Sequence, residues 1–280
     1  MGEATTTSVG SRPSLTSSGK GLQMDPQQIA RITGVLFIIT IIASIPALIL
    51  YGPVLNNPDY VVGAGADTRV FWGAFLEVIT ALACIGTAVV LFPIVKRQNE
   101  AVALSYVASR VLEAALIFVG IVGVLAVVTL RQDFAGAAGV DEATFVAVAN
   151  SLVAAKDWTF LLGPGVLAGV GNGWLLGYLM YRSGLVPRRF AMLGLIGGSL
   201  AVASATATLF GLYDQVSVWA AIAIIPEFIW ELSLGIWLIV KGFDPSAVAS
   251  LCTNADDAVL TGVEQPAAVV PSNGHVASKV

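Results

Sequence analysis

The sequence predicts an all-α polytopic membrane protein, a six-transmembrane-helix bundle with both termini in the cytoplasm. Of its 280 residues, 56% are hydrophobic and only 11% are charged, whereas soluble domains carry about 25% charged residues. The apolar residues form long blocks, unlike the alternating pattern of half-buried strands. Lys and Arg gather on one side of these blocks, and this bias gives the predicted orientation.

The apolar blocks define a membrane domain over residues 26–242. Each block is 19 residues or longer, which is enough to cross a hydrocarbon core of about 30 Å at about 1.5 Å per residue. The first block exceeds the roughly 7–15 residues of a signal-peptide core, so we expect it to be retained as a span. The predicted spans are 32–50, 70–95, 103–130, 158–181, 190–213 and 218–240.

The segments outside the spans are predicted from composition and periodicity. Residues 1–25 and 243–280 lack the composition of a core and are predicted to be disordered cytoplasmic tails. In the long outer loop, Phe145, Ala149 and Leu152 fall on one helical face, which predicts a helix over about 142–156. Two placements stay open for it: in the outer membrane interface, or packed on the bundle as a loop helix.

The distribution of basic residues predicts a cell-membrane protein of the bacterial inner-membrane type. With the N-terminus inside, eight basic residues lie on the inner side and three on the outer side. The inner set is Lys20, Arg31, Lys96, Arg97, Arg182, Arg188, Arg189 and Lys241, and the outer set is Arg69, Arg131 and Lys156.

Several classes of function are excluded by composition. The single histidine, His275, lies in a polar tail, so histidine-based heme, zinc or general-base sites within the membrane are not expected. Cys84 and Cys252 cannot build a disulfide framework, and the net charge of −4 argues against nucleic-acid binding. We expect no metal, no cofactor and no catalytic constellation. Membrane lipid is the expected partner, and oligomerisation is allowed.

Small residues recur at helical spacing in the fourth and fifth spans. In lipid, close backbone contact between small residues supplies much of the attraction between helices. This spacing predicts tight packing of these two spans, either directly or through another span. The helix-packing glycines are Gly165, Gly169, Gly173, Gly177, Gly194 and Gly198.

Five ionisable residues within the spans are the main candidates for a functional site. Each costs roughly 2.5–3.5 kcal/mol or more at the bilayer centre, so each must face protein or water. Helical spacing puts Arg110 and Glu113 on one face, and Glu227 and Glu231 on another. Glu231 is expected level with the first pair, and Glu227 one turn further outward. Glu77 lies nearer the outer side. We predict a shared interior cluster of these five residues.

The charges of this cluster do not balance. One Arg cannot neutralise four carboxylates, and burial beside like charges disfavours ionisation. We therefore expect Arg110 to pair with one or two of the acids and at least one other acid to be protonated at neutral pH. Glu227 is the candidate, because Pro226 before it frees a backbone carbonyl one turn back.

Three stretches carry a resemblance to a known family. They are residues 109–114 (SRVLEA), 181–189 (YRSGLVPRR) and the end of the last span, 226–231 (PEFIWE) and 237–243 (WLIVKGF). With Arg31–Gly34, they resemble the bacterial membrane family catalogued as a domain of unknown function, number 4386, over roughly residues 25–243. The resemblance implies a multi-pass membrane protein and supplies no catalytic residues.

Three functional hypotheses follow. The first is an integral membrane protein whose Arg/Glu cluster fixes helix packing or binds a ligand. The second is a small proton- or cation-coupled transporter that uses the intramembrane glutamates. The third, a membrane-embedded enzyme, ranks last because neither a histidine nor a Ser/Lys pair lies within the spans.

Overall fold

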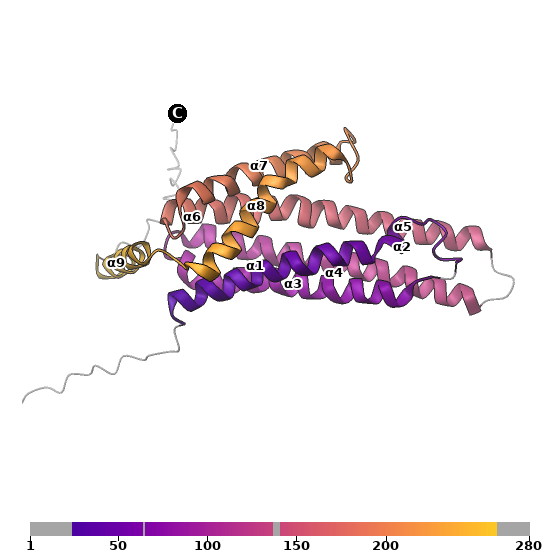
Figure 1. Ribbon diagram of the computed structural model, residues 1–280, viewed down its shortest axis with the longest axis horizontal. Helices are drawn as coiled ribbons and strands as arrows, with labels where there is room; N and C mark the ends of the chain where they lie inside the picture. Colours follow the sequence, from indigo (N-terminus) through magenta and orange to yellow (C-terminus); the bar gives the residue numbers. More distant parts are fainter. Residues whose placement is uncertain (1–23, 64, 137–140, 262–280) are drawn as a thin grey trace, which may run out of the picture.

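A computed structural model describes residues 24–63, 65–136 and 141–261, and every regular element within these ranges is a helix (Figure 1). Six helices are long and apolar enough to cross a membrane, which confirms the predicted all-α bundle of six membrane-spanning helices. The elements are α1 (Pro26–Leu50), α2 (Gly52–Leu55), α3 (Asp67–Val95), α4 (Glu100–Gly136), α5 (Glu142–Phe160), the π-helices η1 (Leu161–Leu167) and η2 (Gly169–Leu176), α6 (Gly177–Ser183), α7 (Arg188–Leu209), α8 (Val218–Val240) and α9 (Pro245–Thr261).

The helices run up and down between two ends of the bundle. We call the end that holds the start of α1 and the end of α8 the tail end, and the opposite end, which holds α2 and the α7–α8 turn, the far end. α9, the last helix described, also lies at the tail end, so the described chain begins and ends at the same end of the bundle (Figure 1). The predicted N-terminal tail lies outside the described residues except for residues 24 and 25.

The fourth span is part of a much longer helix than predicted. α5, η1, η2 and α6 follow one another as a single helical rod over Glu142–Ser183, 42 residues. The segment predicted as a separate outer helix, about 142–156, is the first half of this rod and packs against α4. A helix that continues a span cannot also lie flat in the interface, so that alternative was wrong. The apolar face that predicted this helix is turned towards α4, where Phe145 packs against Phe134.

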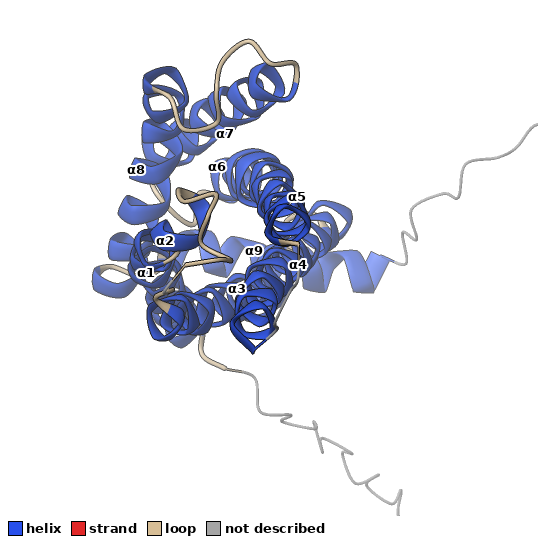
Figure 2. Ribbon diagram, turned by 90° about the vertical axis from the view of Figure 1, so that its right-hand side faces the viewer, coloured by secondary structure: helices blue, strands red, loops and turns tan. Residues whose placement is uncertain are grey.

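The α7–α8 hairpin stands apart from the other helices at the far end. α8 packs on α1 and α7, and α7 packs on η1, η2 and α6. Figure 2 shows the far end of this hairpin separated from α3, α4 and α5. α7 ends at Leu209, four residues before the predicted boundary of 213, because Gly211 turns the chain with a φ of 72°.

The predicted C-terminal tail contains a helix. α9 begins after Asp244, whose carboxylate accepts hydrogen bonds from the Ser246 hydroxyl and backbone amide and from the Ala247 amide. The Ser246 hydroxyl contributes most to holding the pKa of Asp244 below its ordinary value. Ala247 and Leu251 pack into the core at the tail end. The prediction of disorder over 243–280 was therefore wrong for Pro245–Thr261, where a cap and two buried apolar residues outweigh the composition.

Candidate functional site

A central cavity of about 230 Å³ lies within the bundle. It is bounded by α1, α3, α4, the end of α5, η1 and α8, the last across from α4. All five ionisable residues predicted to share a site line this one cavity: Glu77, Arg110, Glu113, Glu227 and Glu231. Three different helices contribute them, so the cluster exists only because the bundle brings these helices together.

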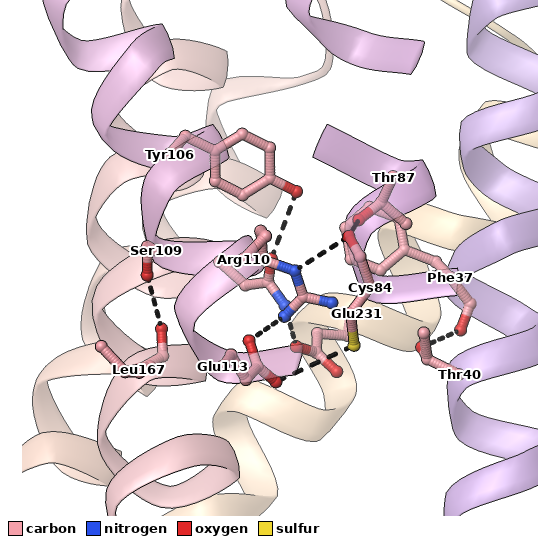
Figure 3. A network of polar contacts seen from close by, with 11 residues as sticks. Phe37, Thr40, Cys84, Thr87, Tyr106, Ser109, Arg110, Glu113, Leu167 and Glu231 are labelled. Atoms are coloured by element: carbon pink, nitrogen blue, oxygen red, sulfur yellow. Dashed lines mark hydrogen bonds and ion pairs between the residues drawn. The ribbon is translucent and has the colours of Figure 1, made fainter. Parts of the chain in front are cut away.

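Arg110 is paired within its own helix. Its Nη1 lies 2.5 Å from Oε2 of Glu113, and its Nε donates to the carbonyl of Cys84 in α3 at 3.5 Å. The Arg110 side chain is only 2% exposed. Figure 3 shows Arg110, Glu113 and Glu231 gathered beside Cys84. Arg110 thus ties α4 to α3, and its formal charge is already balanced by Glu113.

Asn172 in η2 links Glu231 to the rest of the site. Its side-chain amide donates to Oε1 of Glu231, and its Oδ1 accepts from the Tyr106 hydroxyl at 3.3 Å. Trp230 Nε1 donates to the Asn172 carbonyl at 3.0 Å. The π-helical stretch, a form that recurs at functional sites, therefore connects α4 to α8 through one buried amide. Asn172 was not among the residues that the sequence predicted for the cluster.

The partner of Glu77 was not foreseen. Lys156 Nζ lies 2.6 and 2.8 Å from the two carboxylate oxygens of Glu77, and the lysine side chain is 3% exposed. The ammonium also lies 5.3 Å from the centre of the Tyr51 ring. Lys156 had been counted as an outer-loop charge. Its spacing from Ala149 and Leu152 continues the buried face of α5, and that spacing could have revealed it.

Glu227 has no partner among the described residues. It is 2% exposed, and neither of its carboxylate oxygens has a hydrogen-bond partner there. Gly197 in α7 allows this close packing, because a Cβ at that position would lie 2.6 Å from the Glu227 backbone nitrogen. A buried carboxyl without a partner is costly, so Glu227 needs a proton, a cation or water.

The ionisable side chains of the cavity therefore divide into two groups. Glu113 and Glu77 each have a basic partner. Glu231 instead accepts a hydrogen bond from a neutral amide, and Glu227 has no partner among the described residues. With Lys156 included, two cations face four carboxylates, a smaller imbalance than the sequence predicted. The remaining negative charge is concentrated on Glu227 and Glu231, one helical turn apart on α8.

Glycines allow the helices around the site to pack closely against one another. A Cβ on Gly169 would lie 3.1 Å from the Gly198 carbonyl, and one on Gly177 would lie 3.3 Å from the Leu195 nitrogen, so both face α7. Gly173 also meets Gly198, whereas Gly165 has only ordinary contacts, the nearest at 3.6 Å. Gly194 has close neighbours in two helices: a built Cβ would lie 2.6 Å from the Trp230 ring of α8, and the Gly194 carbonyl lies 3.0 Å from a Cβ built on Gly173. α7 is thus in close contact with η2 and α6 on one side and with α8 on the other.

Two further cavities extend from the central one towards the far end. The second, of about 290 Å³, shares Leu48, Phe160 and Ile224 with the central cavity. The third, of about 600 Å³, shares Leu48 and Phe160 with both and contains Asp157 and Asp214. Among the residues that the structure describes, no group of three or more His, Cys, Asp or Glu is placed to hold a metal ion.

Comparison with known families gives one result. The family model described as Domain of unknown function (DUF4386) matches residues 32–242, which is most of the chain and includes all five cavity residues. No curated protein and no solved structure matches the chain.

Proposed function

The chain belongs to the family described as Domain of unknown function (DUF4386), and we propose that it is a small membrane carrier that binds a monovalent cation in exchange for a proton at Glu227. The observation that carries the proposal is the absence of any described partner for the two buried carboxylate oxygens of Glu227. Ionisable groups at membrane depth commonly mark ion or proton pathways. A carboxyl that can hold either a proton or a cation is the minimum that such an exchange needs.

The surroundings of Glu227 support a site for a single positive charge. Glu231 lies one turn away and adds negative potential, while the Arg110 guanidinium is already engaged by Glu113. Pro226 interrupts the hydrogen-bond ladder of α8 beside the carboxyl and leaves a backbone carbonyl free to act as a further ligand. A proton on one acid and a cation beside the other would neutralise the pair.

The two ion pairs support a structural role for the rest of the cluster. Arg110–Glu113 and Lys156–Glu77 are buried and mutually neutralising. Such pairs contribute more to the specificity of packing than to chemistry. The first hypothesis from the sequence, a cluster that fixes helix packing, therefore suits these four residues, while the cation site is confined to Glu227 and Glu231.

A hydrophobic carbodiimide tests the proton-binding step, because it modifies protonated carboxyls in apolar surroundings. We expect mass spectrometry to find the label at Glu227 at neutral pH, with labelling suppressed by millimolar tetramethylammonium or potassium. Glu227→Gln removes the labelled site. Labelling confined to other carboxyls would contradict the proposal.

Reconstituted vesicles test the exchange itself. An imposed gradient of potassium or tetramethylammonium should change the pH inside dye-loaded liposomes that contain the wild-type protein. Glu227→Gln should abolish the response, and Glu100→Gln, which neutralises an exposed glutamate at the tail end of α4, should retain it. Equal responses from the two variants would refute exchange at Glu227.

The orientation in the membrane forms part of the same proposal. Arg31 and Lys241 lie near the tail end of their helices, as do the basic residues of the α3–α4 and α6–α7 turns. At the far end, Lys156 and Arg131 are both engaged in ion pairs. The positive-inside rule then places the tail end in the cytoplasm and opens the cavities to the outer side of a cell membrane. Reporter fusions that put the C-terminus outside would overturn this orientation.

A further inference from the structure

The second cavity differs in chemistry from the central one. Its walls come from α1, the α5–η1 junction, α7 and α8, and no charged side chain is among them. Apolar residues, among them Leu48, Phe160 and Ala221, form most of the surface. The polar residues of the wall are Ser204, Thr208, Gln215 and Ser217. It therefore suits an apolar group that carries no charge of its own.

The two cavities meet at a boundary made by Leu48, Phe160 and Ile224. Glu227 lines the central cavity three residues beyond Ile224 along α8, and Phe228 lines it as well. The Glu227 carboxyl, which has no hydrogen-bond partner among the described residues, thus lies at the inner end of a passage whose next section is apolar. Together the two cavities have the size of a small-molecule site, about 300–1,000 Å³.

We infer that the cation is an amphipathic alkylammonium, with its charged nitrogen beside Glu227 and its alkyl chain in the second cavity. This inference rests on the proposed cation site and specifies its ligand. A small hydrated inorganic ion gains nothing from the second cavity, whereas an alkyl chain gains the free energy of leaving water. The rings of Phe160 and Phe228 line the central cavity and add an attraction for a weakly hydrated ammonium group.

The ligand class is tested by calorimetric titration of the full-length protein in detergent. The probes are tetramethylammonium, hexyltrimethylammonium and neutral hexanol. We expect hexyltrimethylammonium to bind at least tenfold more tightly than tetramethylammonium, since each buried methylene adds about fourfold. Hexanol, which lacks the charge, should bind at least tenfold more weakly than hexyltrimethylammonium.

Two variants test where each end of the ligand binds. Ala221→Phe places a ring in the second cavity and should remove the advantage of the hexyl chain while leaving the affinity for tetramethylammonium unchanged. Ile236→Phe is the matched control, because Ile236 is exposed on the same helix and lines neither cavity. Glu227→Gln should lower the affinity for both cations and leave that for hexanol unchanged.

The outcomes separate this inference from the proposed function. Equal affinities for the two cations, unaffected by Ala221→Phe, would overturn the alkylammonium assignment and leave the cation site standing. Hexanol binding as tightly as hexyltrimethylammonium would overturn the assignment as well, because the charge would then not be recognised. Binding of neither cation would overturn the proposed cation site itself.

Discussion

Replacing Lys156 with methionine removes one half of the buried pair with Glu77 and leaves a carboxylate without its partner. At the observed separations of 2.6 and 2.8 Å, and with an effective dielectric constant of about 20, the attraction between the two charges is about 6 kcal/mol. Burying each ion costs several kcal/mol, so the intact pair contributes little net free energy compared with neutral residues. Removing one partner leaves the burial cost of the other uncompensated. We therefore expect Lys156→Met to lower the free energy of unfolding by about 3–5 kcal/mol.

The assay is chemical unfolding in detergent micelles, with a double-mutant cycle to isolate the pair. Glu77→Gln combined with Lys156→Met should recover most of the loss, because neither buried charge remains. Lys241→Met, which removes an exposed lysine at the end of α8, is the matched control and should be nearly neutral. A loss of less than about 1 kcal/mol for Lys156→Met, below the range for a broken buried pair, would contradict an uncompensated charge at Glu77. A double variant that loses the sum of the two single losses would contradict it as well.

The remaining predictions concern close packing and the C-terminal helix. Gly194→Ala should destabilise the fold by about 1–3 kcal/mol in the same unfolding assay, because the new methyl group meets the Trp230 ring. Gly165→Ala, whose Cβ would meet its first neighbour at 3.6 Å, should cost no more than about 0.5 kcal/mol, and equal losses would contradict the packing described here. Asp244→Ala should loosen α9 and speed the maleimide labelling of Cys252, which is partly covered in this helix. Because the pKa of Asp244 is lowered in the folded chain, its capping contribution is complete above about pH 4. It is lost as the pH falls through the lowered value. Acid slows labelling in both proteins because it removes the reactive thiolate, so the expected sign is a ratio of the wild-type rate to the Asp244→Ala rate that rises towards one in acid.

Patterns within single helices predicted the local part of the site. Arg110 and Glu113 lie three residues apart on one helix, so their pairing follows from helical geometry alone, and the structure places them 2.5 Å apart. The shared face of Glu227 and Glu231 follows in the same way. The cost of charge within a membrane then required these side chains to point inward, which is why all of them line one cavity.

Contacts between distant segments could not be predicted in this way. Lys156 and Glu77 are 79 positions apart, and Asn172 and Glu231 are 59 apart. Which helices become neighbours, and at what depth their side chains meet, depends on packing that no single-helix pattern encodes. The same limit applies to α9, since its stability comes from Ala247 and Leu251 packing on a core built by other helices.

Hydropathy and charge along the chain were thus sufficient to predict that the protein lies in a lipid bilayer, how many helices cross that bilayer, and that the ionisable residues of these helices point inward. The physical reason is that an apolar bilayer acts on each helix separately and penalises every exposed polar group. The tertiary structure alone decided that Glu77 acquires a basic partner in Lys156, that Asn172 holds Glu231, and that Glu227 has no partner among the described residues. That division depends on side-chain distances of a few ångströms between helices, and it makes Glu227, rather than the more conspicuous Arg110, the centre of the proposed function.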